Sequence, residues 1–148
     1  WKLMLNNLIS TYLIIKKMSL YKTYSTMSAK DENEFDPATM MEVYEITSAE
    51  DRENIIQTNK IVVVNNSASW CGPCKQCAPQ FATLCKKYIK PGLCALVKED
   101  VDEMFGGAVQ VSGVPCFHFY INGKFQEEMT VTGADVKLVE TTLQKILY

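Results

Sequence analysis

A pair of cysteines two residues apart, placed after an apolar run, constrains this chain more than any other feature. Residues 70–74 read Trp-Cys-Gly-Pro-Cys and follow the run Ile-Val-Val-Val at 61–64. At the first turn of a helix, two cysteines with this spacing can close a small disulfide ring. The first thiol then faces the positive end of the helix dipole and unpaired backbone N–H groups, so the pKa of Cys71 is expected to fall by about one unit or more. Because the thiolate is the nucleophile of disulfide exchange, Cys71 and Cys74 form a candidate redox pair.

The same pair could be half of a zinc site, because two C-x-x-C pairs make a structural zinc site. Cys77 is the only third cysteine nearby in the sequence. Cysteines spaced three apart along one helix cannot surround a tetrahedral ion, so no metal is expected.

The positions of the remaining cysteines indicate whether the protein works in an oxidising or a reducing cellular compartment. The six cysteines lie at positions 71, 74, 77, 85, 94 and 116, and the first four fall on one predicted helix. Residues three or eight apart on a helix do not build a cross-linked framework. We therefore expect a reducing compartment, one redox pair, and free thiols at Cys77, Cys85 and Cys94 that pack or lie at the surface.

Charge divides the chain into two regions. Residues 1–30 hold five of the fifteen basic residues and none of the seventeen acidic ones, so the remainder carries a net charge of −7. We expect residues 1–41 to be a leader and linker, disordered or used for targeting, and residues 42–148 to be one domain. The apolar part of the leader is too short and too polar to span a membrane. A signal peptide, a mitochondrial presequence and upstream sequence of no consequence all stay open.

The pattern of apolar residues and turn signals predicts the element order β-α-β-α-β-α-β-β-α. Strands are expected at 43–47, 61–64, 94–101, 116–121 and 125–131, and helices at 48–59, 74–87, 102–110 and 134–147. Pro79 is expected to kink its helix, and Asn122-Gly123 to make a hairpin turn. This order predicts an α/β fold with a central mixed sheet and helices on both faces.

Together these residues resemble the thioredoxin family over about residues 43–147. The resemblance rests on Trp-Cys-Gly-Pro-Cys-Lys at 70–75, on Val114-Pro115, and on Pro79, Lys98, Asn122-Gly123 and Gly133 at the family's spacing. It implies the thioredoxin fold and a protein-disulfide reductase that acts in cell redox homeostasis. Cys71 would attack a substrate disulfide, and Cys74 would resolve the mixed disulfide by forming a redox disulfide with Cys71.

The resemblance also implies a substrate-binding loop. Gly113, Val114 and Pro115 match the family's loop that faces the cysteines, in which the proline is cis and the backbone pairs with the substrate chain. Without the motif upstream, a proline at a strand entrance would be ordinary.

Three residues of the motif take further roles by resemblance. Trp70 would shield the disulfide and contribute to docking, whereas the default for a tryptophan is a core position. Gly72 and Pro73 suit a tight entry from strand to helix. A Gly-Pro pair between the cysteines also resembles the family's reductants more than its oxidising relatives, which often carry histidine there.

One departure from the family concerns proton transfer. The family typically has a buried Asp five residues before the tryptophan, which accepts the proton of the resolving thiol, and this chain has Asn65 there. An amide cannot take that proton, so attack by Cys74 should slow at neutral pH. Lys98 matches the lysine that usually pairs with the Asp, and is expected to lack that charged partner here.

The other departures lie beside the site. Asn66 and Ser67 replace the usual aromatic pair and should make the wall behind the cysteines more polar. Cys116 stands after Pro115, where the family usually has Thr, and should lie close to Cys71. It is either a small core residue or an alternative disulfide partner. His118, among aromatic residues on a strand, is expected to be structural.

The resemblance implies partners rather than a bound cofactor. Electrons would come from NADPH through thioredoxin reductase, a flavoprotein. The clients would be oxidised proteins such as peroxiredoxin, ribonucleotide reductase and methionine sulfoxide reductase. A net charge of −2 gives no case for nucleic acid; we also expect no membrane partner, a monomer, and a cytoplasmic location, or a mitochondrial one if residues 1–30 are a presequence. Two other classes stay open, a thioredoxin-fold interaction module and a secretory disulfide oxidase or isomerase.

Overall fold

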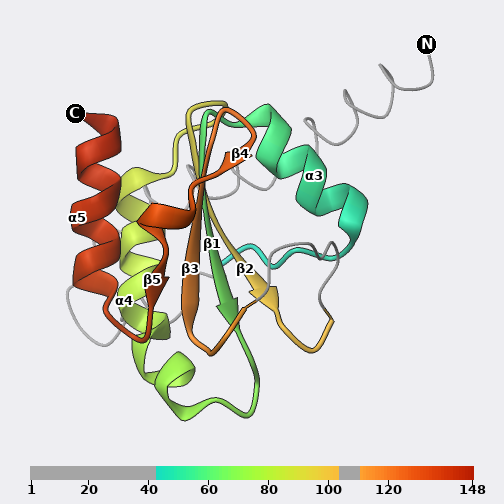
Figure 1. The fold of residues 1–148 in the computed structure, drawn as a ribbon, viewed down its shortest axis with the longest axis vertical. Coiled ribbons are helices and arrows are strands. Elements are labelled where there is room, and N and C mark those ends of the chain that lie inside the picture. Colours follow the sequence, from blue (N-terminus) through green and yellow to red (C-terminus); the bar gives the residue numbers. More distant parts are fainter. Residues whose placement is uncertain (1–42, 104–110) are drawn as a thin grey trace, which may run out of the picture. The chain divides into compact units, whose positions relative to one another are not determined.

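The fold is built on one mixed sheet. The computed structural model describes residues 43–103 and 111–148 of the chain. Within these residues β2, β1, β3 and β4 lie side by side, and β5 also pairs with β3 (Figure 1). In chain order the elements are α3 (Ala49–Thr58), β1 (Ile61–Ser67), α4 (Gly72–Tyr88), β2 (Cys94–Asp100), β3 (Cys116–Ile121), β4 (Lys124–Phe125), the 3₁₀ helix η1 (Glu127–Met129), β5 (Val131–Thr132) and α5 (Val136–Leu147). β1 runs parallel to β2 and antiparallel to β3, so the predicted mixed sheet is confirmed.

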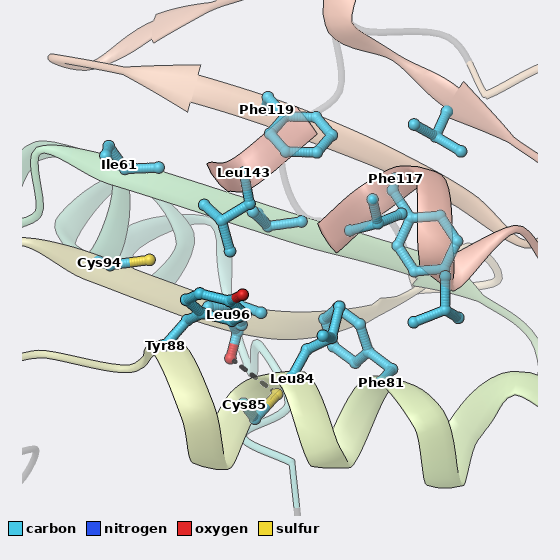
Figure 2. Packing of buried hydrophobic residues seen from close by; sticks show 14 of the residues in the cluster. Ile61, Phe81, Leu84, Cys85, Tyr88, Cys94, Leu96, Phe117, Phe119 and Leu143 are labelled. Carbon is cyan, nitrogen blue, oxygen red and sulfur yellow. Dashed lines mark hydrogen bonds between the residues drawn. The ribbon is translucent and has the colours of Figure 1, made fainter. Parts of the chain in front are cut away.

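The two faces of β1 pack against different helices. Ile61 and Val63 belong to a core cluster with residues of α4 and α5, whereas the alternate residues Val62 and Val64 cluster with residues of α3. All seven residues of β1 are buried, as a continuous apolar run predicts for a central strand covered on both faces. Figure 2 shows the α4 side, where Phe81, Leu84, Cys85 and Tyr88 line the inner face of the helix.

Side-chain caps set where the helices begin. The Ser48 side chain accepts a hydrogen bond from the Asp51 N–H at 3.0 Å, which satisfies a free donor at the start of α3. Cys71 takes the same position for α4, so this helix begins at Gly72, two residues earlier than predicted. Asp135 accepts from the Leu138 N–H at 2.9 Å and starts α5 at Val136. α4 continues through Pro79.

Two predicted strands are wrong in part. Residues 43–47 contribute only an isolated parallel bridge between Glu45 and Lys98. The predicted strand 125–131 is broken by η1, because the Met129 and Thr130 N–H groups bond to carbonyls three residues back instead of to β3. The hairpin turn is confirmed, since Asn122 and Gly123 have φ angles of +50° and +79°.

Two predictions fall largely outside the described residues. The leader and linker at 1–41 lie outside them, as does most of the predicted helix 102–110, of which the described residues 102–103 belong to a turn. In the part of the chain that the structure covers, no helix is both long enough and apolar enough to cross a membrane.

Candidate active site at the start of α4

The site lies where β1 ends and α4 begins. β1 and β2 are parallel, so their carboxyl ends meet at one edge of the sheet. The Val101 N–H, just past β2, donates to the Ser67 carbonyl at 2.9 Å and ties the two ends together. A loop of four residues, 68–71, then carries the chain from β1 into α4.

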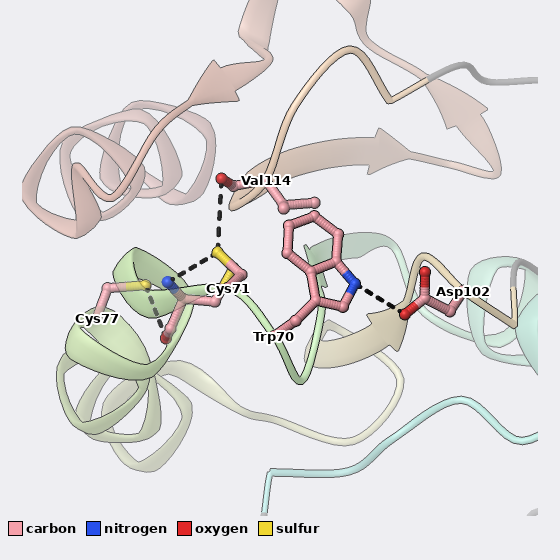
Figure 3. Close-up of a disulfide and its surroundings, with 6 residues drawn as sticks. Trp70, Cys71, Cys77, Asp102 and Val114 are labelled. Atoms are coloured by element: carbon pink, nitrogen blue, oxygen red, sulfur yellow. Dashed lines mark hydrogen bonds between the residues drawn. A yellow bond between two sulfur atoms is a disulfide. The ribbon is translucent and has the colours of Figure 1, made fainter.

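Cys71 and Cys74 form a disulfide at the first turn of α4, with their Cα atoms 5.3 Å apart. The Cys74 N–H donates to Cys71 Sγ at 3.2 Å, and the first turn carries no acidic side chain (Figure 3). A negative charge on Cys71 Sγ would therefore receive a backbone hydrogen bond and face the positive end of a 17-residue helix. This environment favours a thiolate on Cys71 once the disulfide is reduced.

The loop that leads into β3, the strand beside β1, faces this sulfur. The Val114–Pro115 peptide bond is cis, as the family resemblance implies. The Val114 carbonyl oxygen lies 3.7 Å from Cys71 Sγ (Figure 3). The Gly133 N–H donates to the Pro115 carbonyl at 2.8 Å and holds the loop, while Gly113 before it is partly exposed. The predicted residues 113–115 are thus brought against the disulfide.

Trp70 lies beside the disulfide and is 67% exposed. Its indole Nε1–H donates to Asp102 Oδ2 at 3.0 Å, which fixes the ring across the edge of the sheet (Figure 3). The sequence motif does not indicate a role for Asp102. A signal existed, because Asp102 lies two residues past a strand expected to end at the same edge as β1. Gly72 and Pro73 are exposed on the first turn of α4.

The wall behind the disulfide is polar, as predicted. Asn65, Asn66 and Ser67 are each at most 4% exposed. The Asn66 side-chain N–H donates to the Cys116 carbonyl at 3.1 Å. Within the described residues, Asn65 Oδ1 and Ser67 Oγ are buried without a hydrogen-bond partner.

Lys98 has no carboxylate at position 65 to pair with, as predicted, but it has another charged partner that the sequence did not indicate. Lys98 Nζ lies 3.7 Å from Glu45 Oε2, and both side chains are about half exposed. The carboxylate comes from the bridge residue beside β2, not from position 65 of β1. Since both groups are solvated, this pair contributes little to stability, about 0–1 kcal/mol.

Burial makes the four free cysteines poor nucleophiles. It raises the pKa of Cys85 to about 12 and that of Cys94 to about 11, and it also raises the pKa values of Cys77 and Cys116. All four thiols are buried, so none is a surface thiol. Cys116 contacts Thr132 on the neighbouring strand and is a core residue rather than a disulfide partner.

His118 is also buried, packed edge-on against Phe125 with ring centroids 5.0 Å apart. Burial and the nearby positive charge of Arg52 lower its pKa, so it stays neutral at physiological pH, as expected for a structural histidine. In the described ranges, no three His, Cys, Asp or Glu side chains are grouped so that they could hold a metal ion.

Known proteins share this architecture. A family model described as Thioredoxin matches residues 42–145. Thioredoxin of Neurospora crassa is 35% identical over 109 residues, which cover 70% of this chain and 86% of the fungal protein. The structure of Plasmodium falciparum thioredoxin is similar with a TM-score of 0.60 and 33% identity, over 70% of this chain and 98% of that one. Oxidised mitochondrial thioredoxin 3 of Saccharomyces cerevisiae is similar with a TM-score of 0.60 and 26% identity, over 70% of this chain and 94% of that one.

Proposed function

The chain belongs to the thioredoxin family and is a protein-disulfide oxidoreductase, and we propose that Cys71 is its attacking thiol and Cys74 its resolving thiol. One observation carries this assignment of roles. Only Cys71 has its sulfur at the cap position of α4, where it receives the Cys74 N–H, whereas Cys74 lies one turn inside the helix. The sulfur at the cap is the better stabilised as a thiolate and leads the reaction.

The reaction cycle then has two exchange steps. The Cys71 thiolate attacks one sulfur of a client disulfide, a new S–S bond forms, and the electron pair of the broken bond leaves on the client's other sulfur, which takes a proton from solvent. Cys74 then loses its proton and attacks Cys71 Sγ. This attack breaks the mixed disulfide and displaces the client sulfur that was bonded to Cys71, which is also protonated. The client gains two electrons and two protons, and the protein is left with the Cys71–Cys74 disulfide.

The surface around Cys71 Sγ supports docking of an extended client chain. The cis Val114–Pro115 loop presents backbone within 3.7 Å of the sulfur, and Trp70 offers an exposed aromatic face held by Asp102. Backbone pairing at this loop would set the direction of the client chain, and the indole would cover one side of its disulfide. Gly113, without a side chain, leaves room for that approach.

We assign the electron supply and the clients from the family. NADPH would reduce a flavin-containing thioredoxin reductase, which would reduce Cys71–Cys74. Clients would be oxidised proteins such as peroxiredoxins, ribonucleotide reductase and methionine sulfoxide reductases. We assign residues 42–148 as the catalytic domain, acting as a monomer in the cytoplasm; a presequence in residues 1–30 would send it to mitochondria instead, where a yeast relative is found.

Trapping of the mixed disulfide tests the two roles. Incubated with oxidised insulin, Cys74→Ser should accumulate a covalent complex joined through Cys71, whereas Cys71→Ser should form none. Cys77→Ser is the matched control, because Cys77 is a free thiol one turn further along α4, and it should turn over without accumulating a complex. A complex formed by Cys71→Ser and not by Cys74→Ser would reverse the assignment.

A further inference from the structure

Two polar atoms at the end of β1 are buried without a partner. Within the described residues, Asn65 Oδ1 and Ser67 Oγ make no hydrogen bond, and each residue is only 4% exposed. Leaving a buried polar group unpaired costs about 1–3 kcal/mol, and such groups are rare in folded proteins. Two of them in one short stretch beside a redox pair require an explanation in terms of function.

Both atoms face α4. Side chains alternate along a strand, so positions 65 and 67 point to the same side as Ile61 and Val63. Val63 belongs to the core cluster that also contains Cys77 of α4, and Asn65 is paired with Phe117 of that same cluster. α4 starts after the four-residue loop 68–71 and packs on this face through Cys77 and Phe81, so we infer that its first turn, with Cys74, lies over the end of β1.

Of these two cysteines, only Cys74 changes its hydrogen-bonding capacity in the redox cycle. In the disulfide, Cys74 Sγ carries no hydrogen and can donate nothing. After reduction, it gains an S–H group in a position that is 6% exposed, and this donor also needs a partner. The Cys77 thiol already donates to the Cys74 carbonyl at 3.5 Å.

We propose that Asn65 and Ser67 form an acceptor pocket that binds the Cys74 thiol hydrogen in the reduced protein and stays unpaired in the oxidised one. This inference rests on the proposed role of Cys74 as the resolving thiol. The pocket stands in place of a carboxylate but does not take the proton. During resolution that proton still leaves through solvent, and it is the client's departing thiolate that is protonated.

The pocket makes the protein a weaker reductant. The buried acceptors are unpaired in the oxidised form, and reduction adds a hydrogen bond to them, so this bond favours the dithiol. An acceptor that holds the neutral thiol also raises the pKa of Cys74, because it stabilises the protonated form. Asn65 and Ser67 thus tune the redox equilibrium without touching the client.

Removal of the acceptors should make the protein a stronger reductant. Asn65→Leu keeps the approximate shape of the side chain and removes the amide, and Ser67→Ala removes the hydroxyl. In a thiol–disulfide equilibrium with glutathione, each should shift the equilibrium constant toward the protein disulfide, Asn65→Leu by about three- to tenfold, which is about 15–30 mV for a two-electron couple. Ser67→Ala should shift it in the same direction, and less, because a hydroxyl can also donate.

Thr130→Val is the matched control. Thr130 Oγ1 is the third buried and unpaired atom of the described residues, and it precedes β5, which is separated from β1 by β3. Its removal should leave the redox equilibrium unchanged. If Asn65→Leu and Ser67→Ala also leave it unchanged, or shift it no more than Thr130→Val does, the pocket is refuted while the Cys71–Cys74 pair still cycles. Failure of the wild type to equilibrate with glutathione would instead refute the proposed function.

A measurement on the wild type avoids dependence on folding of the variants. The infrared difference spectrum of reduced minus oxidised protein reports the S–H group that appears at Cys74, and one at Cys71 only where that thiol is protonated, because the other four thiols cancel. The band of Cys74, identified by its absence in Cys74→Ser, should lie at the low frequency of a hydrogen-bonded thiol. A band at the frequency of a free thiol would overturn the proposal.

Discussion

Replacing Asn65 by Asp would restore a carboxylate behind the disulfide, at a cost in stability that can be worked out. The position is 4% exposed, and its neighbour in the register on β2, Lys98, is already paired with Glu45. Full burial raises the pKa of a carboxyl group by about 3–5 units, and each unit corresponds to about 1.4 kcal/mol. Lys98 lies close enough to offset part of this cost. We therefore expect the free energy of unfolding of Asn65→Asp to be about 2–4 kcal/mol lower than that of the wild type at pH 8.

The loss depends on pH with a definite sign. A carboxyl group whose pKa is higher in the folded than in the unfolded state holds its proton more tightly when folded. The difference between Asn65→Asp and the wild type should therefore be small near pH 4, grow as the pH rises from about 3.9 through the folded pKa, and stay constant above it. Urea unfolding of both oxidised proteins from pH 4 to pH 8 measures this difference.

The same variant should resolve mixed disulfides faster. A carboxylate near Cys74 can act as a general base, which contributes about 10²–10⁴-fold to a rate in favourable cases, so we expect about 10²-fold at neutral pH. Single-turnover release of reduced insulin, followed by rapid quenching, measures the step. A stability difference that is the same at every pH, together with an unchanged rate of resolution, would show that the carboxylate at position 65 is neither destabilised by burial nor a base for Cys74.

Three further perturbations test other parts of the structure. Arg52 Nε lies 3.2 Å from Glu99 Oε2, and both side chains are largely buried. Glu99→Gln should therefore lower the free energy of unfolding in urea by about 3–5 kcal/mol, and the double variant Arg52→Met, Glu99→Leu should recover most of this loss. An equal loss in the double variant would contradict the prediction. Asp102→Ala releases the Trp70 indole and should raise KM for insulin about three- to tenfold with kcat little changed, since one hydrogen bond is worth about 0.5–1.5 kcal/mol. Burial and Arg52 lower the pKa of His118, so the folded protein resists protonation of this side chain and loses stability as the pH falls below about 6.5. In thermal unfolding, His118→Gln should reduce this loss of stability at low pH. An unchanged pH profile would show that His118 does not cause the loss.

Local sequence signals were enough for the redox pair and most of the elements. The continuous apolar run at 61–64 predicts a central strand, and β1 extends from it. The spacing of Cys71 and Cys74 predicts a helix start, because a disulfide of this size and a capping sulfur both need that geometry. The turn at Asn122-Gly123 follows from the positive φ angles that these residue types accept.

The features that the sequence did not predict depend on register between strands. Lys98 forms an ion pair with Glu45 because a single β-bridge brings the two residues together, and Arg52 of α3 forms an ion pair with Glu99 of β2. Asp102 reaches Trp70 because two parallel strands end at one edge. Periodicity reports which face a side chain takes, but not which residue of a distant strand lies opposite, so these pairs appear only in the folded structure.

The most direct test of the account is reduction of insulin disulfides, driven by dithiothreitol, by the wild type and by Cys71→Ser, with Cys77→Ser as the control for loss of an unrelated thiol. We expect the wild type and Cys77→Ser to precipitate the insulin B chain well ahead of dithiothreitol alone, and Cys71→Ser to match the rate without protein. Equal activity of Cys71→Ser and the wild type, or a wild type that is inactive at every pH, would contradict a reductase that acts through Cys71.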